Sequence, residues 1–430
     1  MTAGTVGAGY VGLTTAVCLA ERGHRTVCVD TDTARVAQLR QGIATLDEPG
    51  LAELLTSGLS DRTLCFSADF GALSDCDVVF VCVPTPSGAD GAADLSAVWS
   101  AVTELRQVLS PGSVIAVKST VPVGTTRDIA TAVRDKGIHV VSNPEFLRES
   151  HAVADAREPD RVLIGAMDDT AADRVGALYG ATADSVLRMA PESAELAKYA
   201  SNAFLAVKLS YVNSLAALCA EVGADIADVT RCMGADARIG GQFLQPGPGW
   251  GGSCLPKDSA ALLYTSRLHG VALREVAASR DTNAAQAPRV VRALSAAMAE
   301  PVASARITAL GLTFKAGTPD VRDSPALTIA AALARQGAEV RGYDPQLAVI
   351  DPKVLRDNGV TAVDDVYTAA KGADALVVLT EWPVFGDLDW PRIAQHAPDA
   401  VVIDTRNVLD SRTVTAAGLR YLGNGRSPGF

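Results

Sequence analysis

One thiol in this sequence lies where a nucleophile would be expected. Cys254 follows a glycine-rich stretch, residues 249–252, and precedes Pro256, which is typical of a first helical position because proline has no N–H to leave unpaired there. At a helix N-terminus the unpaired N–H groups and the helix dipole favour the thiolate, and Lys257 adds positive charge. The alternative is a structural cysteine beside a helix cap, with Asp258 satisfying first-turn N–H groups. This segment by itself supports the two interpretations equally.

A second glycine-rich segment predicts a dinucleotide site. Residues 7–12 read Gly-Ala-Gly-Tyr-Val-Gly, they open a helix expected over 13–20, and Asp30 ends the next predicted strand. The first glycine of such a turn allows the tight bend, the second admits the pyrophosphate, and the third lets the helix pack on the strand. Asp30 would accept from a ribose 2′-OH and repel a 2′-phosphate, which favours NAD over NADP, whereas Arg35 either holds a 2′-phosphate or is solvated. The expected cofactor contacts are Gly7, Gly9, Tyr10, Val11, Gly12, Asp30 and Arg35.

Two further segments follow predicted strands at the edge where open α/β sheets bind ligands. They are residues 83–86, Val-Pro-Thr-Pro, and residues 118–124, Lys-Ser-Thr-Val-Pro-Val-Gly. Ordinary proline and glycine turn chemistry is the alternative explanation for both segments. The residues expected near the nicotinamide end of the cofactor are Pro84, Thr85, Ser119 and Thr120.

Short apolar runs alternate with helical stretches in both halves of the chain, a pattern that predicts parallel sheets covered by helices. Residues 193–222 then show apolar positions at helical spacing over an unusual length, long enough to join two domains. We therefore expect an α/β fold of two doubly wound, Rossmann-like domains joined by a long central helix. The strands predicted are 27–30, 78–83, 114–118, 139–142 and 161–165, with a weaker one within 1–6, and then 306–312, 339–343, 375–380 and 400–404.

Composition excludes several classes of protein. A chain of 430 residues is too long for one core. Its net charge of −11 argues against nucleic-acid partners and anionic membranes. No apolar run approaches the ~18 residues of a membrane span, and no signal peptide opens the chain. Eight cysteines without a CxxC pair indicate reduced thiols in the cytoplasm, and five histidines without ligand spacing predict no metal.

Ten strings, in order and spread over nearly the whole chain, resemble those of the UDP-glucose/GDP-mannose dehydrogenase family. Several of them are rare, so the resemblance is specific, and it is greatest to the members that oxidise UDP-glucose. The strings are GAGYVG (7–12), VCVPTP (81–86), KSTVPVGT (118–125), NPEFLRE (143–149), KYASN (198–202), RIG (238–240), GGSCLPKD (251–258), LGLTFK (310–315), DVRDSP (320–325) and TEW (380–382).

The resemblance implies a four-electron oxidation of a sugar-nucleotide C6 alcohol to a carboxylate with two NAD. A first hydride transfer gives an aldehyde, which a thiol traps as a thiohemiacetal. A second hydride transfer gives a thioester, which water hydrolyses. Simple alcohol oxidation needs no nucleophile, whereas this sequence of steps does. Cys254 matches the nucleophile of the family, which favours its functional interpretation.

Other roles are implied at matching positions. Lys198 and Asn202 lie one helical turn apart and would stabilise oxyanion charge, although a solvated polar stripe is the plain alternative. Asp258 would orient water and lysine, and Glu145 would be the base for thioester hydrolysis, with Thr120 in a water relay. The further cofactor contacts implied are Glu149, Lys257 and Arg322. The substrate contacts implied are Glu145, Phe146, Leu147, Glu149, Lys198, Asn202, Arg238, Phe243, Leu244, Gln245, Gly249, Trp250, Phe314, Lys315 and Arg406.

The resemblance also implies three domains and a partner. These are an NAD-binding domain over 1–192, a helical dimerisation domain with the cysteine loop over 193–299, and a nucleotide-sugar-binding domain over 300–430. A homodimer is expected, with Arg238 near the active site of the partner.

Two departures leave the substrate open, because Gln245 stands where some members have lysine and Leu255 where many have phenylalanine. UDP-glucose is the leading substrate, and dTDP-glucose, GDP-mannose and UDP-N-acetylmannosamine are the alternatives. A non-catalytic nucleotide-sugar binding protein and a two-electron hydroxyacid dehydrogenase are more distant possibilities.

Overall fold

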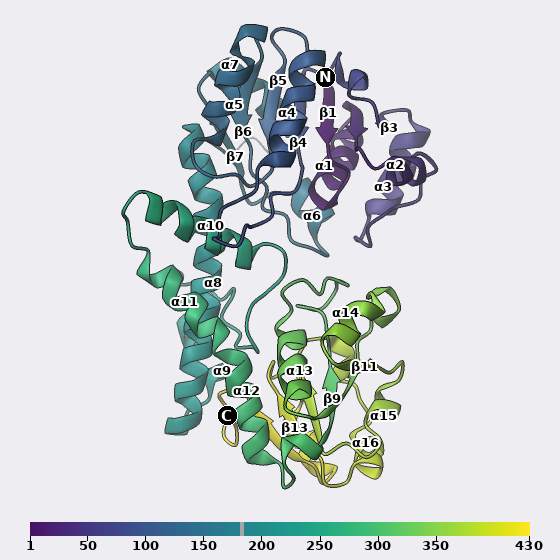
Figure 1. The fold of residues 1–430 in the computed structure, drawn as a ribbon, viewed down its shortest axis with the longest axis vertical. Helices are drawn as coiled ribbons and strands as arrows, with labels where there is room; N and C mark the ends of the chain where they lie inside the picture. Colours follow the sequence, from purple (N-terminus) through teal and green to yellow (C-terminus); the bar gives the residue numbers. More distant parts are fainter. Residues whose placement is uncertain (181–184) are drawn as a thin grey trace. The chain divides into compact units, whose positions relative to one another are not determined.

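The computed structural model describes residues 1–180 and 185–430 and divides into two compact units (Figure 1). The first unit comprises Met1–Ser201 and Ala260–Val271, and the second comprises Asn202–Ser259 and Ala272–Phe430. Each unit contains one sheet with helices packed against it. Two α/β domains and a long helix were predicted, and the structure confirms both. The division into three domains at residues 192 and 299 stays a prediction.

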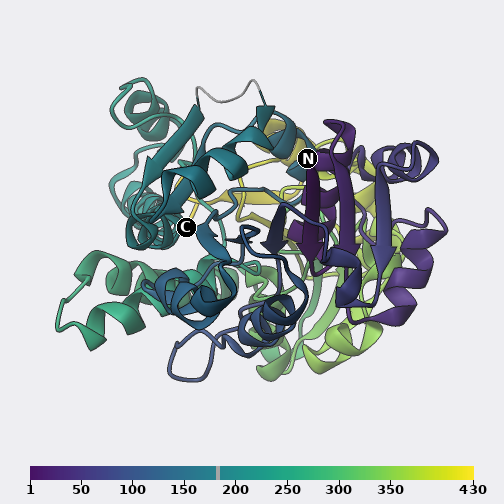
Figure 2. The ribbon, with the colours of Figure 1, turned by 90° about the horizontal axis from the view of Figure 1, so that it is seen from above.

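The first unit is built on an eight-stranded sheet of order β3-β2-β1-β4-β5-β6-β7-β8. Figure 2 shows β1, β2 and β3 running side by side at one end of this sheet. All neighbouring strands are parallel except β6 and β7, which pair antiparallel. The strands are β1 (Thr2–Val6), β2 (Arg25–Val29), β3 (Leu64–Ser67), β4 (Val78–Val81), β5 (Val114–Val117), β6 (His139–Ser142), β7 (Val162–Ala166) and β8 (Val186–Met189).

Helices cover both faces of this sheet, as the burial of alternate strand residues shows. Val79 and Val81 of β4 pack in the cluster that contains Val98 of α4 and Ile129 of α5, whereas Phe80 packs in the cluster of α7. Alternation of this kind follows from the two-residue period of a strand. The helices are α1 (Tyr10–Glu21), α2 (Thr33–Arg40), α3 (Leu51–Ser60), α4 (Ser96–Val108), α5 (Thr125–Val133), α6 (Ala152–Arg157) and α7 (Asp169–Ala177).

The middle of the chain is helical, as its apolar spacing predicts. Helix α8 begins at Pro191 and ends at Val222, close to the predicted range of 193–222. Pro256 is the second residue of α10 and not the first, because the helix begins one residue earlier, at Leu255. The other helices of this region are α9 (Ile226–Gly234), α10 (Leu255–Leu268), α11 (Arg274–Ala284) and α12 (Gln286–Ala297).

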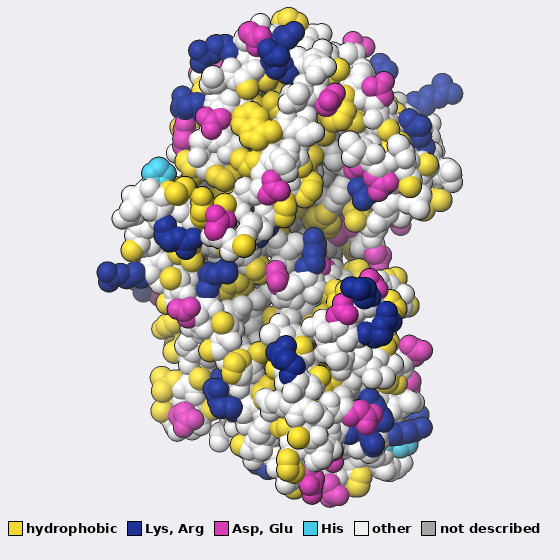
Figure 3. Space-filling model, viewed as in Figure 1, with side chains coloured by type: hydrophobic (Ala, Val, Ile, Leu, Met, Phe, Trp, Pro, Cys, Tyr) yellow, Lys and Arg dark blue, Asp and Glu magenta, His cyan; other side chains and the backbone are white. Residues whose placement is uncertain are grey.

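Helix α8 is also long and apolar enough, by length and composition, to cross a membrane. The core helix of a soluble protein passes the same test, and 39% of its most apolar window is buried within the protein. Two of its polar side chains bind other parts of the second unit: Ser210 donates to the Ser279 carbonyl, and Asn213 accepts from the Gly247 N–H. On the face drawn in Figure 3, basic and acidic side chains are interspersed.

The second unit contains a six-stranded parallel sheet of order β11-β10-β9-β12-β13-β14. The four strands predicted here are all present, and the two strands at the sheet edges, β11 and β14, were not predicted. The strands are β9 (Arg306–Leu310), β10 (Glu339–Tyr343), β11 (Val360–Ala362), β12 (Ala375–Val378), β13 (Val401–Asp404) and β14 (Arg420–Gly423). The helices are α13 (Pro325–Arg335), α14 (Pro352–Asp357), α15 (Val366–Ala369), α16 (Trp390–His396) and α17 (Ser411–Ala416).

Candidate active site

The turn between β1 and α1 has the geometry that its three glycines require. Gly7 has φ +95°, and a Cβ there would lie 2.6 Å from the Cys82 carbonyl oxygen. A Cβ on Gly12 would lie 1.8 Å from the Gly7 carbonyl oxygen, so this glycine permits close packing. A Cβ on Gly9 would meet open space within 4 Å, and no side chain caps the N-terminus of α1. Room and backbone N–H groups at a helix N-terminus fit a pyrophosphate group.

Asp30 follows β2 and is almost fully buried. Its Oδ2 accepts from the Ala8 N–H at 2.6 Å, and its Oδ1 accepts from the Asp32 N–H at 2.9 Å. Arg35, which was expected either to bind a 2′-phosphate or to be solvated, instead pairs with Asp30 Oδ2 at 3.0 Å. The Arg35 side chain is 38% exposed. Asp30 therefore supports the glycine turn and also presents a carboxylate beside it.

The two loops at the carboxyl ends of β4 and β5 hold each other. The Ser119 hydroxyl donates to the Val83 carbonyl at 2.7 Å, and the Thr85 hydroxyl donates to the Thr120 carbonyl at 2.9 Å. Both hydroxyl protons therefore bind protein carbonyls. The two oxygens keep lone pairs with which to accept hydrogen bonds from a ligand.

Glu145 and Lys198 form a buried ion pair in the first unit. Lys198 Nζ lies 3.1 Å from Glu145 Oε1, and the side chains are 5% and 10% exposed. The other carboxylate oxygen accepts from the Leu147 N–H at 2.5 Å, and the ammonium lies 5.0 Å from the Phe146 ring centre. Burial raises the pKa of Glu145, but the charge of Lys198 and these hydrogen bonds outweigh burial and lower the pKa overall. Glu145 is therefore a carboxylate at neutral pH.

In the second unit, Cys254 stands directly before α10, and its carbonyl accepts from the Asp258 N–H at 2.9 Å. The thiol thus lies at a helix N-terminus, as predicted. The Asp258 carboxylate is 1% exposed and accepts from Asn202 Nδ2 and from Lys257 Nζ, each at 2.6 Å. The structure therefore brings Asn202 and Asp258 together and pairs Lys257 with the same carboxylate.

The glycines before Cys254 let other parts of the second unit approach its backbone. A Cβ on Gly251 would lie 2.0 Å from the Asp323 carbonyl oxygen, and one on Gly252 would lie 2.8 Å from the Phe314 ring. The Gly252 N–H also donates to the Arg322 carbonyl at 3.1 Å. The cysteine loop is therefore packed against the 311–324 loop that carries Phe314.

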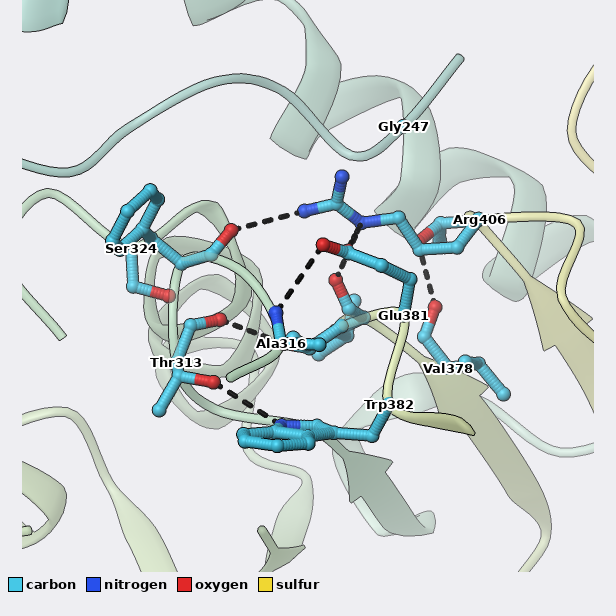
Figure 4. A network of polar contacts seen from close by, with 12 residues as sticks. Gly247, Thr313, Ala316, Ser324, Val378, Glu381, Trp382 and Arg406 are labelled. Carbon is cyan, nitrogen blue, oxygen red and sulfur yellow. Dashed lines mark hydrogen bonds and ion pairs between the residues drawn. The ribbon is translucent and has the colours of Figure 1, made fainter. Parts of the chain in front are cut away.

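Arg406 is held in a polar network that the sequence analysis did not foresee (Figure 4). Its Nε lies 3.1 Å from Glu381 Oε2, and its Nη2 donates to the Phe314 carbonyl at 3.1 Å. Glu381 Oε1 accepts from the Ala316 N–H at 3.2 Å. The guanidinium faces Gly247, where a Cβ would lie 2.9 Å from Nη1. The Thr-Glu-Trp string at 380–382 was the available signal for Glu381, although no role was predicted for this residue.

Comparisons with known proteins agree with this geometry. Residues 1–183 match the NAD binding domain of the UDP-glucose/GDP-mannose dehydrogenase family, residues 192–285 its central domain, and residues 308–411 its UDP binding domain. The chain belongs to the UDP-glucose/GDP-mannose dehydrogenase family. It is accordingly an NAD-dependent nucleotide-sugar dehydrogenase.

Relatives within the family span the whole chain. A UDP-glucose 6-dehydrogenase of Rhizobium meliloti is 41% identical over 98% of both chains. The structure of a UDP-glucose dehydrogenase from Pyrobaculum islandicum matches with a TM-score of 0.90 and 34% identity, covering 99% of this chain and 98% of that one. A UDP-D-ManNAc dehydrogenase from Pyrococcus horikoshii matches with a TM-score of 0.88 and 27% identity over 99% of both chains.

The remaining residues expected from the family lie mainly in the second unit. The Leu244 side chain packs in a core cluster with Val212 and Ala216, so only its backbone is left to meet a ligand. Trp250 is buried, and its indole N–H donates to the Ser210 hydroxyl at 2.9 Å. Other predicted contacts that are exposed or half-buried are Phe243, Gln245, Gly249, Phe314, Lys315, Arg322 and Arg238 in the second unit and Phe146, Leu147 and Glu149 in the first.

Two exposed arginines of this set have carboxylate partners nearby in the sequence. Arg238 pairs with Asp236, and Arg322 pairs with Asp320. Within the described ranges 1–180 and 185–430, no group of three or more His, Cys, Asp or Glu side chains is placed to hold a metal ion.

Proposed function

We propose that the chain is a UDP-glucose 6-dehydrogenase, which converts UDP-glucose to UDP-glucuronate with two NAD. The observation that carries this proposal is the thiol of Cys254 at the N-terminus of α10. Asp258, in the first turn of that helix, accepts a hydrogen bond from Asn202 of α8. A two-electron dehydrogenase has no use for such a nucleophile. The full-length similarity to UDP-glucose 6-dehydrogenases supports the choice of substrate.

The proposed steps balance around C6. The Gly7–Gly12 turn and Asp30 would hold NAD, which would supply the acceptor for each of the two hydrides lost from C6. Loss of the first hydride and the hydroxyl proton gives an aldehyde, and the Cys254 thiolate then adds to C6 to form a C–S bond and an alkoxide. Loss of the second hydride leaves a thioester. Water attacks the thioester and the C–S bond breaks. This step regenerates the Cys254 thiolate and releases the carboxylate as product.

The roles of the surrounding residues follow from their charges. Lys198 and Asn202, four residues apart on α8, supply a cation and an amide for the oxygen that carries negative charge. Glu145 remains ionised beside Lys198, so it can accept a proton from the attacking water, with Thr120 as the relay. Asp258 fixes the amide of Asn202 and the ammonium of Lys257.

The nearest alternatives use the same chemistry on another nucleotide sugar. Gln245 is exposed in the 243–250 loop and neutral where a lysine would attract phosphate, so we propose a pocket that tolerates thymine as well as uracil. One methyl group on an apolar wall changes binding by about 1–3 kcal/mol, so UDP-glucose and dTDP-glucose should differ by less than about 200-fold in kcat/KM. GDP-mannose and UDP-N-acetylmannosamine should be turned over more slowly.

A panel of nucleotide sugars tests this proposal, with NADH counted per product formed. We expect two NADH for each UDP-glucuronate. One NADH per product would indicate a two-electron dehydrogenase, and no turnover of any sugar would indicate a binding protein. Efficient oxidation of GDP-mannose with little activity on the pyrimidine substrates would move the chain to the mannose branch.

We also propose a cytoplasmic homodimer that uses the exposed face of α8, with Arg238 near the active site of the partner. Phe204, Tyr211, Leu218 and Val222 are each more than half exposed and share one face of this helix. A second copy of the chain would cover this apolar stripe, so that no membrane lipid is needed to shield it from water.

The test of assembly is sedimentation of Leu218→Glu, with Leu268→Glu as the control. Both leucines are exposed, but Leu268 lies on α10 and not on the stripe. We expect the first variant to be monomeric and the second to remain dimeric. A wild-type chain that is monomeric and fully active at nanomolar concentration would contradict the proposal.

A further inference from the structure

A buried carboxylate in the first unit belongs to none of the groups described so far. Glu48, in the connection between α2 and α3, is 6% exposed. Its Oε1 accepts from the Ala152 N–H at 2.5 Å, and its Oε2 accepts from the Ser150 N–H at 2.8 Å. The Tyr10 hydroxyl lies 3.2 Å from Oε2 and 2.7 Å from the Arg148 carbonyl oxygen, so its proton is shared between two acceptors.

These contacts join two segments that are far apart in the sequence. Tyr10 is the first residue of α1 and follows Gly9, so its backbone belongs to the turn that binds the dinucleotide. Arg148, Ser150 and Ala152 lie in and just after the loop that carries Glu145 and Glu149. One carboxylate and one hydroxyl thus fasten the catalytic loop to the cofactor turn.

The loop is also held in a conformation that it would not adopt without support. Ser150 has φ +68°, in the left-handed region that residues other than glycine rarely occupy. Such a residue persists only where surrounding contacts hold it, and the hydrogen bond from its N–H to Glu48 is one of these contacts. Burial and the charge of Glu48 raise the pKa of Tyr10, so its hydroxyl stays protonated and remains a donor.

We propose that Glu48 and the Tyr10 hydroxyl are a positioning pair that fixes the 145–152 loop to the dinucleotide turn, so that binding of NAD orders the loop that carries Glu145. The consequence for hydrolysis rests on the proposed function. In a reaction that binds NAD twice, this link keeps the hydrolytic base in place when the cofactor site is filled. Neither residue is a catalytic residue, because each acts through the loop.

Hydrogen exchange with NAD alone tests the link without any sugar substrate. In the wild-type chain, saturating NAD should slow amide exchange in the peptide that spans residues 146–153. In Tyr10→Phe, which keeps the ring and loses the hydroxyl, this response should be lost although NAD still binds. Tyr264→Phe, on α10, is the control and should respond as the wild type does. An unchanged response in Tyr10→Phe would overturn the proposal.

Kinetics give a second measurement that a merely structural role would not change. The net contribution of one hydrogen bond corresponds to a factor of about 2 to 12, so Tyr10→Phe should slow hydrolysis of the thioester, the step that follows formation of the second NADH, by a factor in that range. KM for the sugar should stay close to the wild-type value. Glu48→Gln should have a larger effect, because the amide cannot accept all the bonds that the carboxylate accepts, and exposed Glu53→Gln is its control.

The double variant shows whether Tyr10 and Glu48 act together or independently. Tyr10→Phe combined with Glu48→Gln should be no slower than Glu48→Gln alone, because residues that act together are not additive. Strict additivity would contradict the proposal. If Glu48→Gln fails to fold, the exchange response of Tyr10→Phe still decides the matter. If the wild-type chain does not oxidise UDP-glucose, the exchange result stands while the proposed function fails.

Discussion

The two sheets of this molecule share one topology but differ at the point where each first strand ends. In both, the strand order runs 3-2-1-4-5-6, and a glycine with positive φ follows the first strand, Gly7 at +95° and Gly311 at +91°. Each of these glycines donates its N–H at 2.8 Å to the end of the second strand. An aspartate then follows each second strand, Asp30 in the first unit and Asp344 in the second.

The two aspartates have different surroundings. Asp344 is 1% exposed, and its Oδ2 alone lies within hydrogen-bond distance of the Leu312 N–H, the Thr313 N–H and hydroxyl, and the Trp382 indole N–H. Asp30 is 8% exposed, accepts from two backbone N–H groups and pairs with the half-exposed Arg35. The aspartate that can meet a ribose is therefore Asp30, whereas Asp344 is committed to holding its own turn.

The segments that follow the two glycines, Gly7 and Gly311, also differ between the two units. In the first unit α1 begins at Tyr10, three residues after Gly7, and presents its N-terminus at the turn. In the second unit α13 begins only at Pro325, so residues 311–324 form a loop. This loop packs against the glycines that precede Cys254. The same topology thus supports a dinucleotide site in one unit and a thiol-bearing loop in the other, because function lies in the loops.

The largest expected effect comes from removing the chemistry of the second unit alone. Cys254→Ser should lower turnover by a factor of about 10³ or more, because a hydroxyl is a far weaker nucleophile than a thiolate. NAD binding in the first unit should be unchanged. Cys232→Ser, at another exposed cysteine of the second unit, is the control. Carboxylate formation by Cys254→Ser at the wild-type rate would exclude the covalent mechanism.

The next largest effect on turnover is expected from removing the cation of the buried ion pair in the first unit. Lys198→Met leaves Glu145 buried without its cation. Loss of one partner of a buried ion pair lowers the free energy of unfolding by about 3–5 kcal/mol. Because the charge of Lys198 is the largest of the effects that oppose burial, its loss should raise the pKa of Glu145. The acidic limb of the kcat profile should therefore move to higher pH, into the range where the wild-type profile is flat. An unshifted limb would show that Glu145 is not the titrating base.

A smaller effect on stability is expected at Asp344. Asp344→Ala leaves several buried donors without an acceptor, and each such donor costs about 1–3 kcal/mol. The free energy of unfolding should fall, as measured in urea, while the ratio of NAD to NADP affinity stays at its wild-type value. A changed cofactor preference in this variant would erase the proposed distinction between the two aspartates.

Regular patterns made the strands, the long helix and the positions of Cys254 and the glycine turn predictable. Four edge strands were missed, β3, β8, β11 and β14, because each has only three or four residues and none has more than three consecutive apolar residues. The contacts of Glu48 and Glu381 join segments that are distant in the sequence, and the pairing of Arg35 with Asp30 depends on the direction of two side chains. No local periodicity records such contacts. The burial of Leu244 was missed for the same reason.

The smallest effect is expected on cofactor preference, from a substitution at Asp30. This prediction bears most directly on the difference between Asp30 and Asp344. Asp30→Ala removes the acceptor for the ribose 2′-OH and a charge that repels a 2′-phosphate, and it releases Arg35 from one of its carboxylate partners. A hydrogen bond to a charged group contributes about 1.5–3 kcal/mol, so the preference for NAD over NADP in kcat/KM should fall by about 10-fold or more. Absolute affinity should also fall, because the Ala8 N–H loses its acceptor, so the ratio is the quantity to measure. Arg35→Ala in the same background should restore part of the preference for NAD, since the guanidinium is then no longer available to a 2′-phosphate. A wild-type chain with higher kcat/KM for NADP would reverse the roles of Asp30 and Arg35, and the first sheet would then differ from the second by its arginine and not by its aspartate.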